Sequence, residues 1–166
     1  MTDYVTDQGG AALGARLRRL SAQIDADAAK IYETEGARFE QRWFGVINQL
    51  ALNGPMSVTS LAAALGISHP SISETRQSLQ RAGIIEARPD PDDSRRRILS
   101  LSPAGEALIR RLRPLWQVFD AVARDLDAEA GNVTLALARL ETALARKSLH
   151  ARIIERIGET AADASA

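Results

Sequence analysis

Residues 57 to 105 decide the fold of this chain, and they read SVTSLAAALGISHPSISETRQSLQRAGIIEARPDPDDSRRRILSLSPAG. The pattern predicts a short helix over residues 57–65, with Ser57 or Thr59 as its N-cap. This helix ends at Gly66, because glycine readily takes the left-handed conformation at a helix C-terminus. A second helix is expected to begin after Ser68, whose hydroxyl can cap it, and to end at Gly83. Two helices joined by a tight turn predict a helix-turn-helix.

The residues after Gly83 predict a β-hairpin. Residues 84–88 and 96–101 have strand character, and the stretch 89–94 between them is rich in proline and aspartate, as turns are. A helix-turn-helix followed by such a hairpin is a winged helix-turn-helix. The predicted fold class is therefore mainly α with a small β-hairpin wing.

The two ends of the chain predict long amphipathic helices, because apolar residues recur there at steps of three and four. These segments cover residues 12–35, 103–130 and 133–157, and a further helix rich in large apolar residues is expected over 38–52. The apolar stripes of the end helices can be buried against one another and against a second copy of the chain. A monomeric bundle that closes on itself is the alternative.

We therefore expect one domain over residues 1–166, in which long helices form a dimerisation platform around a winged helix. The dimerisation helices are placed at residues 11–35 and 106–158, and the DNA-binding region at residues 38–105. A hydrophobic content of 45% is sufficient for a real core in a chain of 166 residues.

The composition excludes several classes of protein. The absence of cysteine excludes disulfide bonds, thiolate metal sites and thiol-based redox sensing. His69 and His150 lie far apart in the sequence, so neither a metal site nor a cofactor is expected. Residues 1–10 are polar, without the basic start and apolar run of a secretory leader, and the sequence has no apolar run near the ~20 residues of a membrane helix. The expected protein is soluble and cytoplasmic, with no membrane partner.

The hairpin carries a signature that runs Asp93-x-Arg95-x-x-x-Leu99-x-Leu101-Ser102-x-x-Gly105. In this signature the chain resembles the MarR-type (multiple antibiotic resistance) regulators, with Ser102 where threonine is more usual. Residues 38–44, 54–59 and 67–73 resemble most closely the regulator half of proteins that carry a fused N-acetyltransferase. The chain is expected to lack that acetyltransferase domain.

The resemblance implies a transcriptional regulator that responds to a ligand and binds an inverted-repeat operator in double-stranded DNA as a homodimer. Repression is the expected mode, and activation is the alternative that the sequence leaves open. It also implies a short third strand at residues 56–58. No nucleophile, base and orienting residue recur at a plausible spacing, so an enzyme is not expected. The alternative function is a winged-helix protein-interaction module without specific DNA binding.

The helix at residues 69–82 is expected to enter the major groove with its first two turns. Ser71, Ser73 and Arg76 are the candidate groove contacts. The candidates near phosphates or groove edges are Ser68, His69 and Gln77.

In the wing, Asp93 can orient Arg95 toward a narrow minor groove, while Arg96 and Arg97 are expected to meet flanking phosphates. The alternative is a solvated hairpin tip. Equal numbers of basic and acidic residues, 21 of each, mean that overall charge does not indicate nucleic-acid binding. The local placement of these arginines therefore carries the prediction.

The resemblance also implies an effector crevice between the helical platform and the winged helix. Its candidate residues are Tyr32, Arg38, Arg42, Trp43 and Trp116. Aromatic walls with an arginine would suit a small aromatic or anionic effector by stacking and charge pairing. The alternative is that the aromatic residues belong to the hydrophobic core.

Overall fold

A computed structural model describes residues 3–91, 93 and 96–163. The chain forms two compact units, Met1–Arg111 and Leu112–Ala166. The mainly helical fold class with a small sheet is confirmed, whereas the expected grouping of the whole chain into one domain stays a prediction. None of the described helices combines the length and the apolar character needed to cross a membrane.

The first unit begins with the short helical turns α1 (Tyr4–Asp7) and η1 (Gly9–Ala12), which precede the predicted long helix α2 (Leu13–Thr34). The elements after α2 are α3 (Trp43–Asn53), β1 (Met56–Ser57), α4 (Val58–Leu65), α5 (His69–Arg81), β2 (Ile85–Pro89), β3 (Arg97–Leu101) and the first part of α6 (Pro103–Glu129).

The helix-turn-helix is α4 and α5, and its predicted caps are confirmed. The Ser57 hydroxyl accepts a hydrogen bond from the Ser60 amide at 3.0 Å, and Gly66 ends α4 with a φ of 64°. The Ser68 hydroxyl accepts from the Ser71 amide at 3.3 Å at the start of α5. These caps satisfy amides that have no partner within the helix.

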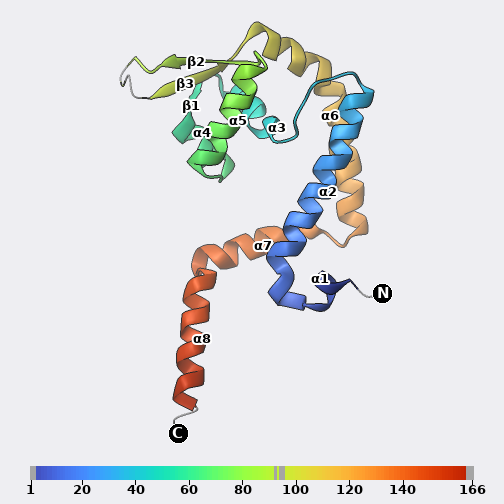
Figure 1. Ribbon diagram of the computed structural model, residues 1–166. Helices are drawn as coiled ribbons and strands as arrows, with labels where there is room; N and C mark the ends of the chain where they lie inside the picture. The colour runs from blue at the N-terminus through green and yellow to red at the C-terminus, as the bar shows by residue number, and fades with distance from the viewer. Residues whose placement is uncertain (1–2, 92, 94–95, 164–166) are drawn as a thin grey trace. The chain divides into compact units, whose positions relative to one another are not determined.

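The three strands form an antiparallel sheet in the order β1-β3-β2, which confirms the predicted short third strand. Figure 1 shows β2 and β3 extending as an arm beside α4 and α5. Ser57 pairs with Ile98, and Arg97 pairs with Pro89. Because α4 follows directly after β1, this register places the start of α4 beside the wing end of β3.

The core of the first unit joins the helix-turn-helix to the sheet and to α2 and α3. Ring centroids of Tyr32 and Phe39 lie 4.6 Å apart, and those of Phe39 and Trp43 lie 5.7 Å apart in an edge-to-face arrangement. Fully buried apolar side chains include those of Trp43, Ile47, Leu61, Ile72, Leu79 and Leu99. These side chains pack the inner face of α5 into the core, so the outer face of α5 remains accessible from solvent.

The predicted helix at residues 38–52 starts later than expected, at Trp43. Residues 38–42 form a connection instead. Phe39 is buried, and the Trp43 amide donates to the Glu40 carbonyl at 2.8 Å. The Ser78 hydroxyl donates to the Glu40 carboxylate at 2.9 Å. This hydrogen bond and the burial of Phe39 depend on packing between residues that are distant in the sequence. Helical periodicity does not predict such packing.

The second unit contains the rest of α6, followed by α7 (Val133–Arg146) and α8 (Leu149–Asp163). The prediction of one helix over 133–157 is wrong. Lys147 is extended with a φ of −153°, and the Ser148 hydroxyl accepts from the Ala151 amide at 3.1 Å to cap a new helix. This second helix continues past Gly158, beyond the predicted end.

Candidate nucleic-acid interface

The outer face of α5 is polar and accessible. Of the residues predicted to face DNA, Ser68, His69, Ser71 and Gln77 are exposed, whereas Ser73 and Arg76 are half-buried. Ile72, Thr75, Ser78 and Leu79 are buried on the opposite side. The helix is therefore anchored by one face and presents hydroxyl, imidazole, amide and guanidinium groups on the other.

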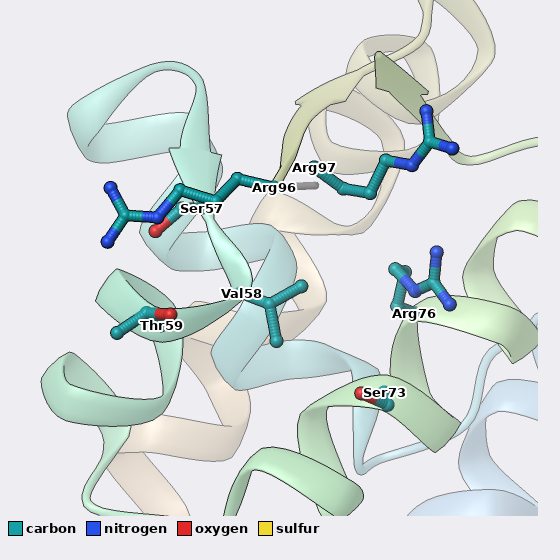
Figure 2. A pocket seen from close by; sticks show the side chains of 7 residues that line it. All are labelled: Ser57, Val58, Thr59, Ser73, Arg76, Arg96 and Arg97. Carbon is teal, nitrogen blue, oxygen red and sulfur yellow. The ribbon is translucent and has the colours of Figure 1, made fainter. Parts of the chain in front are cut away.

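Beside α5 lies a cavity of about 270 Å³, which we call the three-arginine hollow. Its lining residues are Ser57, Val58, Thr59, Ser73, Arg76, Arg96 and Arg97. Figure 2 shows Arg76 rising from α5 toward the wing strand, with Arg97 beyond it and Arg96 extending past Ser57. The hollow thus joins three of the predicted DNA-facing arginines and one predicted serine.

Strand pairing explains why these distant residues meet. Ser57 pairs with Ile98, so Arg97 lies one residue further along β3 and Val58 begins α4 next to it. Ser73 and Arg76 are three residues apart on α5, so they lie on the same side of that helix. The sheet and the helix-turn-helix together form the walls of the hollow.

The hollow has a cationic lining. None of its seven lining residues is acidic. Arg96 has an exposed carboxylate partner in Asp93, whose Oδ2 lies 3.9 Å from the Arg96 Nε, a distance that is long for a hydrogen bond. The Arg76 Nε is buried and has no acceptor within the described part of the chain. Guanidinium groups in such a setting can bind phosphate or carboxylate in bidentate fashion.

The tip of the wing is described only in part, because Arg95 lies outside the described residues. Its predicted minor-groove contact and its orientation by Asp93 therefore stay predictions. The wing loop is closed by backbone hydrogen bonds from Arg96 to the Asp93 carbonyl at 2.8 Å and from Asp90 to the Arg96 carbonyl at 3.1 Å. These bonds position Arg96, and through it Arg97, at the start of β3.

Two of the predicted effector residues belong to the core. Tyr32 and Trp43 are each only 1% exposed. The Tyr32 hydroxyl donates to the Gln41 Oε1 at 3.0 Å, and the Trp43 Nε1 donates to the Ser78 hydroxyl at 3.1 Å. Both polar groups are satisfied within the protein, so a ligand is not needed to explain their burial.

The two other effector candidates of the first unit, Arg38 and Arg42, are exposed. Arg42 forms an ion pair with Glu40 at 2.6 Å. One cavity of about 290 Å³ is lined by Arg38, Glu40, Trp43, Ser78, Arg81 and Ala82. A second, of about 280 Å³, is lined by Asp25, Ala29, Phe39, Glu40, Gln41 and Arg42. Trp116 is half-buried in the second unit, and its place in a crevice stays a prediction.

Sequence reasoning missed two parts of this region. The sequence pattern indicates only a helix-capping role for Ser57 and Thr59, although both line the hollow. Ser78 was not singled out, although its buried hydroxyl links Trp43 to Glu40. A serine on the apolar face of α5 was the only local signal for this second link. The described residues contain no cluster of His, Asp or Glu that could hold a metal ion.

Known proteins are similar to this chain in both sequence and fold. A family model described as MarR family matches residues 39–96. A protein of Thauera aromatica, named as a putative transcriptional regulatory protein for the hcr operon, is 33% identical over 133 residues, which cover 77% of this chain and 78% of that protein. The crystal structure of the MarR family transcription regulator SP03579 is 31% identical, covers 86% of this chain and 95% of its own, and superposes with a TM-score of 0.60. This chain belongs to the MarR family.

MarR-family proteins are transcriptional regulators and not enzymes, in agreement with the expectation from sequence. A more distant member, a mutant MarR from E. coli in complex with operator DNA, is 17% identical and has a TM-score of 0.64. It covers 86% of this chain and 99% of its own, and at this identity the likeness shows the fold alone.

Proposed function

We propose that this MarR-family chain is a ligand-responsive transcriptional regulator that binds an inverted-repeat operator as a homodimer. The observation that carries DNA binding is the three-arginine hollow, which lies beside α5 and has no acidic lining residue. Local cations of this kind neutralise backbone phosphates and release counterions even when the net charge of the protein is zero. The exposed hydroxyls and amides of α5 then supply groups that can contact base edges.

Exposed apolar faces in each unit support the homodimer. In the first unit, α2 exposes Leu13, Leu17, Leu20, Ile24 and Ile31. In the second, α6, α7 and α8 expose Val118, Val122, Leu126, Val133, Leu135, Leu144, Leu149, Ile153, Ile154 and Ile157. A second copy of the chain is the occupant that these regular stripes fit, because a two-fold dimer covers the same surface on both subunits. Two α5 helices related by a two-fold axis would match an inverted repeat.

The structural relatives support both parts of the proposal. The E. coli MarR mutant was crystallised with operator DNA, and the PcaV regulator from Streptomyces coelicolor, 21% identical with a TM-score of 0.61, with its natural ligand. For this chain we propose a small aromatic or anionic effector, with Arg38 as its charge partner beside the cavity that Trp43 lines. The closer resemblance to regulators fused to N-acetyltransferases concerns residues 38–105 and stays a prediction.

Fluorescence anisotropy with a duplex from the DNA that flanks its own gene tests DNA binding. We expect the affinity to fall by about 10³ or more between roughly 50 and 200 mM salt, as for proteins with several phosphate contacts. Replacing both Arg96 and Arg97 by Gln should weaken binding, whereas Arg139→Gln with Arg146→Gln, on α7, should leave it unchanged. A wild-type dimer that binds no duplex from this region would favour the protein-interaction alternative.

The ligand response can be tested on the preformed complex. Small aromatic carboxylates and phenols are added singly, and release of the labelled duplex is measured. A compound that releases the wild-type protein should release Arg38→Gln only at higher concentration, because the guanidinium that pairs with its anionic group is gone. Equal release of both proteins would remove Arg38 from the effector site.

A further inference from the structure

We infer that the three-arginine hollow seats one phosphate of the DNA backbone, and that Arg76 binds this phosphate instead of reading a base. The inference rests on the proposed DNA binding and deepens it, because it assigns the role of the arginine on α5. Sequence alone placed Arg76 among the groove contacts together with Ser71 and Ser73. In the structure, the side chain of Arg76 leaves α5 on a different side from that of Ser71.

The position of Arg76 along α5 favours a backbone contact. Arg76 follows His69 by seven residues, which corresponds to about 10 Å along the helix axis. Helices of this class contact base edges with their N-terminal residues. Arg76 lies about two turns beyond those residues, which favours a contact with the backbone over a contact with a base.

The direction of Arg76 around the helix favours the same contact. Arg76 lies five positions after Ser71, so the two side chains leave the helix about 140° apart. Ser71 is exposed on the outer face, whereas Arg76 is half-buried and lines the hollow. In Figure 2 its side chain extends toward β3 and the wing. A base edge that Ser71 contacts is therefore on a different side of α5 from the Arg76 guanidinium.

The Arg76 Nε lacks an acceptor within the described residues although it is shielded from solvent. An unpaired buried donor on a charged group is unfavourable, and few are left so in native proteins. A phosphate oxygen that enters the hollow and draws the guanidinium toward it would supply this missing acceptor. A phosphodiester offers two such oxygens, which match the paired N–H groups of arginine.

The other groups of the hollow are complementary to phosphate. Arg96 and Arg97 contribute two more guanidinium groups, which can only donate hydrogen bonds. The hydroxyls of Ser57 and Thr59 lie at the N-terminal end of α4, where the helix dipole also favours an anion. Base edges present both donors and acceptors, whereas phosphate oxygens only accept. A cationic lining rich in donors therefore fits a phosphate better than a base.

The test compares Arg76→Gln with the control Arg139→Gln, which removes an exposed arginine of α7 that does not line the hollow. Preferred sites are selected from a random duplex pool, and affinities are measured over a series of salt concentrations. For Arg76→Gln we expect the wild-type motif, and binding that is about tenfold weaker or more to both specific and nonspecific duplexes. The slope of log affinity against log salt should fall by about 1.8 for the dimer, because each lost phosphate contact contributes about 0.9. Arg139→Gln should keep the wild-type slope.

Ser71→Ala serves as the comparison for base reading and should alter the selected motif without changing the salt slope. If Arg76→Gln behaves like Ser71→Ala, Arg76 reads a base and the inference is overturned. Unchanged affinity and salt slope in a folded Arg76→Gln dimer would overturn it as well. Arg76→Lys keeps one cation and should restore part of the salt slope.

A second measurement separates this inference from the proposed function. The NMR signal of the Arg76 Nε–H is followed in the wild-type protein during addition of duplex, dimethyl phosphate or inorganic phosphate. We expect the duplex and dimethyl phosphate to shift the signal. A signal that only inorganic phosphate shifts would assign the hollow to a free anion and overturn the inference. Absence of any duplex binding overturns the proposed function. Duplex binding that leaves the Arg76 Nε–H signal unshifted overturns only the inference that Arg76 binds a backbone phosphate in the hollow.

Discussion

A β-carbon added to Gly105 would lie 2.2 Å from the carbonyl oxygen of Ile84. The same carbonyl accepts a hydrogen bond from the Ser102 amide at 3.0 Å, and the Ser102 hydroxyl donates to the neighbouring Gly83 carbonyl at 2.6 Å. The Gly105 amide donates in turn to the Ser102 hydroxyl at 3.0 Å. The first turn of α6 therefore lies directly on the backbone that leaves α5, and only glycine permits this approach.

Gly105→Ala should destabilise the protein by about 3 kcal/mol, because a methyl group cannot be placed against the Ile84 carbonyl without displacing α6 or β2. Urea denaturation followed by circular dichroism gives the free energy of unfolding. Gly14→Ala is the matched control, because Gly14 lies in α2 with only an ordinary contact to Arg18 at 3.6 Å. The control should be neutral or stabilising by up to about 1 kcal/mol. Equal stability of the two variants would contradict the close approach.

Ser78→Ala should cost about 2 kcal/mol, because it leaves the buried Trp43 Nε1 without its acceptor and removes the hydrogen bond to the Glu40 Oε1. The Glu40 carboxylate keeps its exposed pairing with Arg42. Ser78 is 6% exposed, so water cannot easily replace the hydroxyl. The control is Ser60→Ala, which removes an exposed hydroxyl and should stay within about 0.5 kcal/mol of wild type. In a Trp116→Phe background, a change in Trp43 emission should accompany the loss. Unchanged stability and emission would show that this link is unimportant.

The Asp127 carboxylate accepts hydrogen bonds from the Thr134 hydroxyl at 2.6 Å and the Thr134 amide at 2.8 Å, and these bonds lower the pKa of Asp127 below its ordinary value of 3.8. Thr134→Val removes the hydroxyl and should raise the pKa toward 3.8, as measured by NMR titration of the carboxyl carbon. A lowered pKa in the folded state stabilises the fold above pH 3.8, and this contribution is lost as the pH falls through the lowered value. Thr142→Val, elsewhere on α7, should leave the titration unchanged; an unmoved pKa in Thr134→Val would exclude the hydroxyl as the cause.

Leu17→Asp and Ile154→Asp should each dissociate the proposed dimer. These side chains are 38% and 56% exposed in the single chain, so the substitutions are tolerated in a monomer but place an unpaired charge in a dimer interface. Light scattering should report about twice 17.9 kDa for the wild type and a mass near 17.9 kDa for folded variants. Leu52→Asp, on α3 outside the end helices, should remain dimeric. A folded, dimeric Leu17→Asp and Ile154→Asp pair would show that the interface lies elsewhere.

Features that depend on a few neighbouring residues were predictable. Ser57 and Ser68 cap their helices, and Gly66 ends α4, because each needs only hydrogen bonds or backbone freedom within one helical turn. The exposed polar side of α5 was also predictable, since helical periodicity separates it from Ile72 and Leu79. Periodicity failed at Lys147, where apolar spacing continues across a break that the Ser148 hydroxyl and an extended backbone produce.

The sequence by itself determined the winged helix-turn-helix, its caps and which arginines belong to α5 and the wing, because these follow from local propensity and spacing. Only the tertiary structure decided that Arg76 shares a hollow with Arg96 and Arg97 and leaves the side on which Ser71 is exposed. This arrangement depends on the pairing of Ser57 with Ile98 across the sheet and on the packing of α5. Such long-range register is set by the total burial of the core, which no local pattern in the sequence records.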